Sequence, residues 1–395
     1  MKPAGKKTPR TAKLPLGVYI AICALPAILT ILFYLCRSDS GAMDWAAMHI
    51  SAPIRRVLSL LSSVYPFSMM EILCAAAVIW LIYYITRTIV MVVRRRGKLK
   101  ILLKRVTAIM VIALYAWCMF SWLWNSGYSA RGFAEKNGFT GGGVSVEHLA
   151  AVTRLFAEKS NEFSLLVIRD EDSRYIEDRK GFFDISPLIY QNIMAEYPSL
   201  EGKVQRPKSM MFSWLMSRTG YTGIYFALTG ESNINTRAPT FLMPATIAHE
   251  LAHQLGVFAE DEATFVGIMA SVTSGYDVYE YAGYMMGLMY LRSALYSVDS
   301  DAWAEISGIL RDEVILDLQE NYNYWESQKT VDTGAALFDN LLTSMTETLS
   351  DTVNTIYDGY LKAQNQELGV RSYGACVDLL VEYYSAESPA LATNR

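Results

Sequence analysis

The sequence MPATIAHELAHQLGVFAEDEATF occupies residues 243–265 and holds two of the four histidines of the chain. Pro244 suits the first turn of a helix, where its missing N–H is not needed, and Gly256 suits the end, where a left-handed residue is favoured. Apolar residues recur at every fourth position between them and form one stripe: Ile247, Leu251 and Leu255. This pattern predicts a short helix over about residues 245–255.

The two histidines of this predicted helix are His249 and His253. They are four residues apart and therefore share a second face, one turn from each other. Two imidazoles at this spacing can bind one tetrahedral Zn²⁺. Glu250 follows the first histidine directly, and HExxH on a helix is the motif of zinc metallopeptidases, in which the glutamate is the general base. The sequence predicts a zinc site with His249 and His253 as ligands and Glu250 as the catalytic base.

A catalytic zinc site usually has a third protein ligand and one open position. No histidine follows His253, so we expect a carboxylate in this role. Glu260, Asp261 and Glu262 open a second predicted helix, which runs to Gly275. Acids at this position also favour the helix itself, and one that is not a ligand could orient a histidine N–H. The candidates for the third ligand are Glu260 and Glu262.

A strand is predicted shortly before the metal helix. Residues Tyr221–Leu228 (YTGIYFAL) are rich in aromatic and β-branched side chains, whereas Gly230–Asn235 (GESNIN) indicates a polar turn or loop. An edge strand above a metal helix can hold an extended peptide by main-chain hydrogen bonds, and a plain core strand is the alternative. Residues 301–361 continue with helical periodicity. We therefore expect an α+β, mostly helical, zincin-like unit over residues 126–395.

Residues 1–125 are predicted to be a membrane anchor. Twenty apolar residues cross about 30 Å of hydrocarbon, and three runs satisfy this length as transmembrane helices: 16–35, 67–93 and 106–124. A cleaved signal peptide is the alternative for the first run, but that run is longer than a usual signal core and no small-x-small cleavage site follows it. We predict three spans.

The charges indicate how the spans are oriented. Residues 1–125 contain sixteen Lys and Arg against three Asp and Glu, whereas residues 126–395 contain nineteen against thirty-six. The basic residues concentrate in the N-terminal tail and in the loop 94–105, which the positive-inside rule places in the cytoplasm. Three crossings then put residues 126–395 outside the cytoplasm. Because the basic residues flank apolar runs instead of covering a folded face, nucleic-acid binding is not expected.

Residues 45–65 lie between the first two predicted spans and form an amphipathic segment. Ile54, Leu58 and Leu61 follow helical spacing within it. This segment could lie on the outer membrane surface, or it could pack against the outer unit. The sequence leaves both interpretations open.

The whole layout resembles an uncharacterised bacterial family of membrane-anchored zincins with three N-terminal spans. Members have HELAHQxG, then an EDEA segment and a C-terminal YLKxxxQxxGVxSYG stretch. This chain has HELAHQLG from His249, EDEATF from Glu260 and YLKAQNQELGVRSYG over Tyr360–Gly374. TGESNIN at Thr229–Asn235 is also similar, whereas Thr264 stands where members often have Asn or Asp. The resemblance implies a peptidase of unspecified substrate.

The resemblance also bears on individual roles. In zincins with a glutamate ligand, that ligand often lies on the following helix in a Glu-x-x-Ala setting, which favours Glu260 over Glu262. A zincin further benefits from a donor aimed at the oxyanion that develops during attack on an amide. Tyr373, in the C-terminal stretch, is our candidate for that donor, and packing is the alternative role.

The sequence thus predicts a multi-pass cell-membrane protein that binds Zn²⁺ and hydrolyses peptide or protein substrates outside the cytoplasm. The competing hypothesis is a non-catalytic receptor or scaffold that retains a zinc-binding zincin fold, which the intact Glu250 disfavours. An intramembrane protease would carry HExxH inside a span, and here the motif lies about 125 residues beyond the last one. A transporter is disfavoured because the spans contain few charged residues.

Overall fold

The computed structural model describes residues 16–94, 98–140, 144–176, 178–200, 202–330, 336–363 and 373–387. Most of these residues are helical and one small sheet lies among them, which confirms the mostly helical character expected from the sequence. The first part comprises α1 (Leu16–Cys36), α2 (Ser40–Ala46), the π-helical turn η1 (Ala47–Ser51), α3 (Ala52–Ser63), α4 (Met69–Arg94), α5 (Lys98–Phe120), the π-helical turn η2 (Ser121–Asn125) and α6 (Ser126–Ser129).

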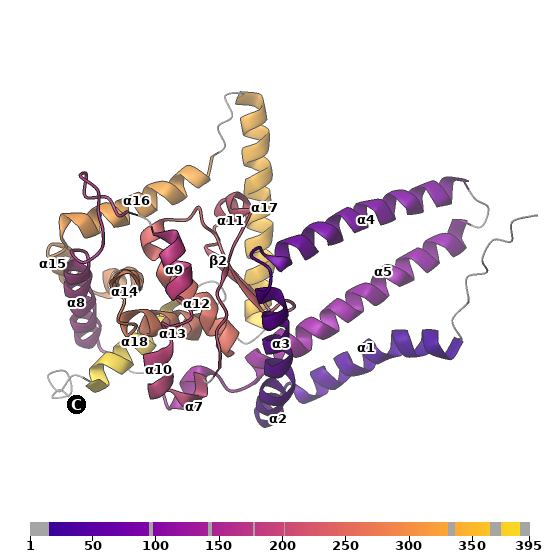
Figure 1. Ribbon diagram of the computed structural model, residues 1–395, viewed down its shortest axis with the longest axis horizontal. Coiled ribbons are helices and arrows are strands. Elements are labelled where there is room, and N and C mark those ends of the chain that lie inside the picture. The colour runs from indigo at the N-terminus through magenta and orange to yellow at the C-terminus, as the bar shows by residue number, and fades with distance from the viewer. Residues whose placement is uncertain are drawn as a thin grey trace, which may run out of the picture.

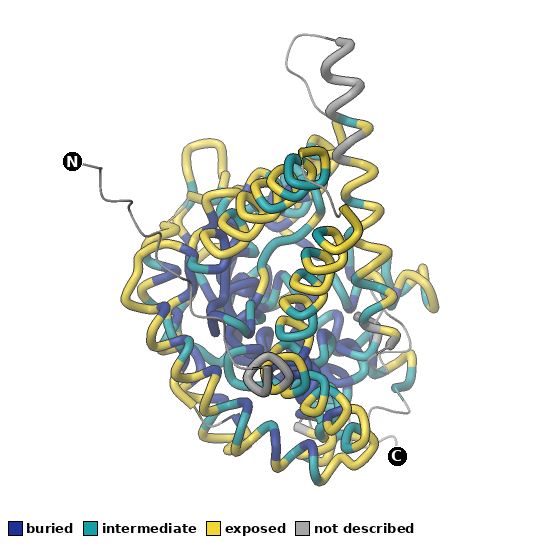
Figure 2. Tube along the Cα trace, turned by 90° about the vertical axis from the view of Figure 1, so that its right-hand side faces the viewer, coloured by how far each residue is buried: buried dark blue, intermediate teal, exposed yellow. Residues whose placement is uncertain are grey.

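Within the part of the chain that the structure describes, two helical segments are long and apolar enough to cross a membrane: α4 and the continuous helix from Lys98 to Ser129. A shorter apolar stretch, Ala21–Cys36, lies in α1. The three helices project together from the rest of the molecule (Figure 1), and none of the most apolar segment of α4 is buried. Figure 2 looks along them and shows many exposed residues on their surfaces. A core helix of a soluble protein would be mostly buried, so these helices indicate association with a membrane.

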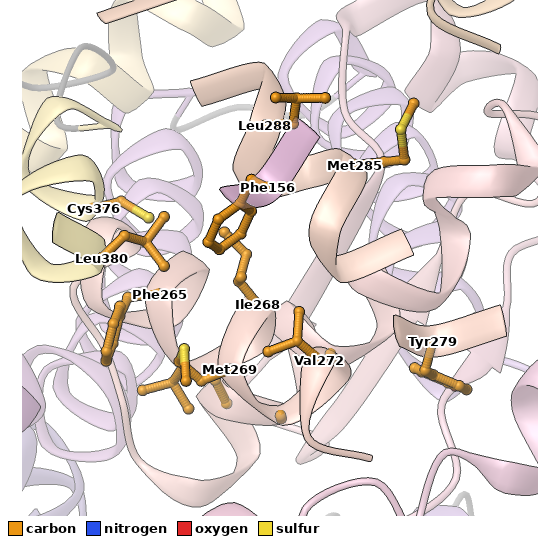
Figure 3. Packing of buried hydrophobic residues seen from close by; sticks show 14 of the residues in the cluster. Phe156, Phe265, Ile268, Met269, Val272, Tyr279, Met285, Leu288, Cys376 and Leu380 are labelled. Carbon is orange, nitrogen blue, oxygen red and sulfur yellow. The ribbon is translucent and has the colours of Figure 1, made fainter. Parts of the chain in front are cut away.

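The second part packs its helices around one apolar core. Helices α8, α13, α14 and α18 meet there, and their side chains interdigitate in Figure 3: Phe156, Phe265, Ile268, Leu288 and Leu380. The elements are α7 (Phe133–Asn137), α8 (Val146–Phe163), α9 (Arg179–Ile185), α10 (Gln191–Glu196), η3 (Pro198–Leu200), β1 (Lys208–Ser209), α11 (Ser213–Thr219), β2 (Gly223–Phe226), β3 (Glu231–Ile234), η4 (Thr240–Leu242), α12 (Met243–Leu255), α13 (Glu260–Val272), α14 (Asp277–Val298), α15 (Ser300–Ser307), α16 (Asp312–Gln328), α17 (Ala336–Ala363) and α18 (Tyr373–Glu387). This core supports α12 and α13 from behind.

The sheet has the order β1-β3-β2, with β1 and β3 parallel and β2 and β3 antiparallel. The predicted strand within Tyr221–Leu228 is therefore found, as β2, and it is an edge of the sheet. The prediction of a loop over Gly230–Asn235 is wrong, because Glu231–Ile234 forms the buried central strand β3. The side chains of Glu231 and Ser232 tolerate burial because they are hydrogen-bonded: Ser232 Oγ donates to the carbonyl of Glu250 at 2.7 Å, and Glu231 accepts from the amides of Met69 and Met70.

Candidate metal centre

The metal helix is α12, and its sequence signals act as expected. The helix runs two residues further at its N-terminus than the predicted 245–255, and Gly256 ends it in the left-handed region with φ 96°. The second predicted helix is α13, which ends at Val272, before Gly275. The two helices approach closely at Gly267, where a Cβ would lie 2.8 Å from the backbone nitrogen of His249. Glycine is therefore required at this crossing.

Three of the predicted site residues come together between these helices. Glu260 Oε2 lies 3.2 Å from His249 Nε2 and 3.7 Å from His253 Nε2. One ligand atom from each residue lies within 4.8 Å of the other two, and the group could hold a metal ion. Two imidazole nitrogens and one carboxylate oxygen suit a divalent transition metal. Glu260 and His253 are buried, so the site is shielded from bulk water.

Hydrogen bonds fix which nitrogen of each imidazole faces the centre. Nδ1 of His253 donates to the carbonyl of Val257 at 2.7 Å. Thr264 Oγ1 donates to the carbonyl of Glu260 and lies 3.2 Å from His249 Nδ1, so the hydroxyl accepts from that nitrogen. Both Nε2 atoms therefore face the centre, and such bonds also increase the basicity of a metal ligand. Thr264 thus supplies the hydrogen bond for which members of the resembling family often have Asn or Asp.

The two candidate third ligands have different surroundings. Glu262 does not reach the histidines and does not orient either of them. Instead, its carboxylate accepts from the amides of Phe133 and Ala134 at 2.8 and 2.9 Å, and so caps the first turn of α7. It approaches Gly132 so closely that a Cβ there would lie 2.3 Å from Oε1. Of the two acids, only Glu260 is placed to join His249 and His253.

A tyrosine that sequence reasoning missed also contacts the centre. Tyr357 lies on α17 and donates from its hydroxyl to Glu260 Oε1 at 2.5 Å. Its ring also packs edge-on against Tyr221, which precedes β2. The predicted oxyanion donor, Tyr373, is the first residue of α18, and its side chain lies outside the described residues. Helical spacing along α17 does not distinguish a tyrosine that donates to a predicted metal ligand from one that only packs.

The charges of the three clustered groups are strongly coupled. Burial alone would raise the pKa of Glu260, but the imidazoles of His253 and His249 hold it well below the usual value. Burial lowers the pKa of His253, whereas Glu260 and Glu250 raise it, and the result is about 8. The anionic Glu260 carboxylate thus holds a proton on His253 at neutral pH, and a bound metal would take the place of that proton between the same side chains.

Glu250 is buried beside this cluster, under strand β2. Burial raises the pKa of its carboxyl. Gly223 on β2 leaves room for the carboxylate, since a Cβ there would lie 2.5 Å from Oε1. Oε2 has no hydrogen-bond partner among the described residues. A buried carboxylate oxygen without a partner is costly, so the site maintains an unsatisfied acceptor close to the metal ligands.

Residues of the predicted anchor contact the centre from the side opposite to α13. Arg55 on α3 is buried and donates from Nη1 to the carbonyl of His253 at 3.2 Å. The ring of Trp124, in η2 at the end of α5, packs edge-on against His253 with centroids 5.4 Å apart. The backbone of α3 lies against Gly230, where a Cβ would meet the Arg55 carbonyl at 2.6 Å. The anchor is thus in direct contact with a predicted metal ligand.

A cavity of about 970 Å³ reaches α12, although none of the four predicted site residues on α12 and α13 lines it. It is lined by parts of α11, α14, α16 and α17, and it reaches Thr246 on α12 and Thr222 before β2. Thr246 is one helical turn before Glu250, and Thr222 precedes Gly223, which contacts the Glu250 carboxylate. The cavity therefore offers space for a ligand close to the site.

Comparison with known proteins identifies the family. A family model described as "Protein of unknown function (DUF3810)" matches residues 48–381. The chain belongs to this family. The matched range of the DUF3810 chain includes α4, α5 and every residue of the metal centre described above. No curated protein and no solved structure matches the chain.

Proposed function

We propose that this protein is a membrane-anchored zinc metallopeptidase that hydrolyses peptide bonds outside the cytoplasm. The observation that carries the proposal is the convergence of His249, His253 and Glu260 beside the buried carboxylate of Glu250. Two histidines and a glutamate with one open position form a known ligand set of catalytic zinc. When bound, zinc polarises the substrate carbonyl and lowers the pKa of the attacking water.

Glu250 is the general base in this proposal. The hydroxyl of Ser232 donates to its backbone carbonyl, and Gly223 on β2 lies against its carboxylate, so the group is oriented before substrate arrives. Burial raises its pKa, which makes the carboxylate a stronger proton acceptor. A glutamate kept only for stability would be expected to have both oxygens paired. The unpaired Oε2 therefore supports catalysis over a non-catalytic zinc scaffold.

Strand β2 is the proposed binding edge for an extended peptide. It pairs with β3 on one side, and no strand pairs with its other edge among the described residues. Gly223 on β2 lies against the Glu250 carboxylate, so a peptide added to this edge would pass the general base. Main-chain hydrogen bonds would supply affinity with little sequence preference.

We further propose that α1, α4 and α5 are three spans, with the N-terminus in the cytoplasm. The test is labelling of single cysteines by a membrane-impermeant maleimide, after replacement of the five native cysteines. A cysteine at Tyr322, which is exposed on α16, should react in intact cells. A cysteine at Lys98, in the basic loop, should react only after permeabilisation. The reverse pattern would refute the proposed orientation.

The enzymatic proposal is tested on the full chain, purified and reconstituted in lipid nanodiscs. We expect one zinc per chain and cleavage within a mixed peptide library. Glu250→Gln should keep the zinc and lose about 100- to 10,000-fold in turnover, the range for general acid–base groups. Glu305→Gln, at an exposed glutamate, is the matched control and should behave as the unmodified chain.

Absence of a transition metal after reconstitution would refute the metal centre. Full zinc content without cleavage of any peptide would instead support the scaffold hypothesis. Tyr373→Phe is expected to lower turnover and leave zinc content intact, and unchanged turnover would remove Tyr373 as the oxyanion donor.

A further inference from the structure

Helix α3 has an inverted distribution of polar and apolar side chains. The face that it buries against the rest of the protein is polar, with Arg55, Ser59 and Ser62 in successive turns. The opposite face is exposed and apolar: Ile54, Val57, Leu60, Leu61 and Val64. A helix on the surface of a soluble domain has the reverse arrangement. The exposed face of α3 therefore requires an apolar environment outside the described chain.

Helix α17, at the other side of the centre, also exposes apolar side chains, although most of its exposed residues are polar. Tyr360 on α17 packs against Phe120 at the end of α5, with ring centroids 5.8 Å apart. Leu349 and Ile356 lie eleven and four residues earlier, on the same face of the helix, and are 41% and 66% exposed. In Figure 1, α3 and α17 run crosswise to α1, α4 and α5, at the end of these helices that meets the outer unit. Both helices thus occupy the level at which the apolar helices leave the body of the protein.

The same two helices touch the metal centre with their inner faces. Arg55 of α3 donates to the carbonyl of His253, and Tyr357 of α17 donates to Glu260. Packed helix axes are about 8–10 Å apart, and one helix radius adds about 5 Å. The metal ligands therefore lie only about 15 Å from the exposed apolar faces.

We propose that the exposed faces of α3 and α17 lie in the headgroup layer of the bilayer that α4 and α5 enter, and that the metal centre consequently cleaves peptide bonds within a few residues of the membrane surface. The substrate class is the juxtamembrane segment of membrane-anchored proteins. This inference rests on the proposed peptidase function for its second part only.

The bilayer is the occupant that the observations favour over a second copy of the chain. Only residues 64–68 separate α3 from α4, and the apolar surface of α4 is itself exposed along its length. The apolar face of α3 is therefore continuous with a surface that lipid would cover. A helix of this kind buries its apolar face about 5–10 Å into the boundary between headgroups and acyl chains.

The position of α3 is tested without any assay of activity. In the full chain, with its native cysteines replaced, a polarity-sensitive fluorophore is placed on a single cysteine at Leu61, at Ser63 or at Tyr322, and the protein is reconstituted in nanodiscs. A lipid that carries a nitroxide near its headgroup should quench the label strongly at Leu61 and not at Tyr322. Equal quenching at Leu61 and Tyr322, or strong quenching at Leu61 by a water-soluble quencher alone, would refute the placement.

The substrate class is tested with a library of random peptides attached to vesicle lipids by an acyl chain. Because an extended peptide covers about 3.3 Å per residue, we expect cuts from about the fifth residue after the anchor, mapped by mass spectrometry. Cuts that begin only beyond about fifteen residues, or roughly 50 Å, would refute the inference.

Matched variants separate this inference from the proposed function. Leu61→Glu should reduce cleavage of the anchored peptides about tenfold through a changed approach to the membrane, with zinc content and cleavage of soluble peptides unchanged. Ser63→Glu, exposed on the polar flank of α3, should change none of these. Equal effects of the two variants would refute the role of the apolar face. If soluble and anchored peptides both remain uncut and Glu250→Gln makes no difference, the peptidase function fails, while the fluorescence result still decides the placement.

Discussion

The metal centre is held from two sides that differ in kind. On the inner side, α13 packs against α12 within the main core, and the crossing at Gly267 leaves no space for a Cβ. On the outer side, α3, η2 and α17 each reach a metal ligand through one hydrogen bond or one ring contact. Close packing fixes positions to within fractions of an ångström, whereas single polar contacts can be lost without unfolding the core. The inner side therefore sets the geometry of the proposed ligands, and the outer side links that geometry to the helices that we propose as membrane spans.

The largest expected effect is on zinc affinity, and it distinguishes Glu260 from Glu262 on α13. Glu260→Ala removes a ligand and should weaken zinc binding by more than about 100-fold, the upper end of the loss seen when only a supporting partner is removed. Glu262→Ala should retain zinc, but it leaves the amides of Phe133 and Ala134 unpaired, at a cost of about 2 kcal/mol in the free energy of unfolding. Competition with a chelator and thermal unfolding in nanodiscs measure the two quantities. Loss of zinc in Glu262→Ala would show that Glu262 also contributes to zinc binding on the inner side.

The next effect tests the close packing of the inner side. Gly267→Ala places a Cβ 2.8 Å from the backbone nitrogen of His249, and overpacking of this kind costs about 1–3 kcal/mol. We expect a lower unfolding temperature and weaker zinc binding, because the helices must separate at a ligand. Gly359→Ala on α17 is the control, since no atom lies within 4 Å of its added Cβ. The control should raise stability by up to about 1 kcal/mol, and equal responses of the two variants would contradict the role of the crossing.

A smaller effect is expected on the outer side, at Arg55. Arg55→Ala removes the donor to the His253 carbonyl and the guanidinium that lies 4.7 Å from the ring of Phe258. Loss of the partner of a buried group costs about 1–3 kcal/mol, and zinc binding should weaken about fivefold, less than the effect of removing the acceptor of an imidazole N–H. Arg56→Ala changes the exposed residue next to Arg55 and should have little effect on the free energy of unfolding or on zinc affinity. If the two variants bind zinc equally well, α3 lies beside the centre without supporting it.

The inner side could be predicted from the sequence because its signals are local. Helical periodicity, Pro244 and Gly256 define α12 to within two residues, and the spacing of His249 and His253 places both on one face. Glu260 was favoured by the setting of Ala263 in a resembling family, not by spacing alone. The exclusion of Glu262 depends on α7, whose amides occupy that carboxylate, and no pattern along α13 contains this information.

The outer side could not be predicted because its contacts join distant parts of the chain. Arg55 lies 198 residues before His253, and in the sequence it is one of the few cations of a loop between spans. The polar composition of β3 predicts a loop. The strand can be buried because the Met69 amide donates to Glu231 and the Glu250 carbonyl accepts from Ser232, and both partners are distant in the sequence. Residues 45–65 fit two interpretations. The buried polar face of α3 packs against the outer unit, as one of them predicts, whereas its exposed apolar face leaves the membrane-surface placement as our proposal.

The smallest expected effect is a difference in zinc affinity between nanodiscs and detergent, which compares a hydrogen bond from each side. Thr264→Val keeps the shape of the side chain but removes the oxygen that accepts from His249 Nδ1, so zinc binding should weaken about tenfold, the low end for such partners. Thr264→Ser keeps the hydroxyl and should bind zinc like the unmodified chain. Tyr357→Phe removes the corresponding donor to Glu260 from the outer side. Because Thr264 is fixed in the core helix while Tyr357 belongs to the half-buried α17, the zinc affinity of Tyr357→Phe should depend on whether the protein is in nanodiscs or detergent, and that of Thr264→Val should not. The same dependence in both variants would mean that the two sides respond to the membrane as one unit.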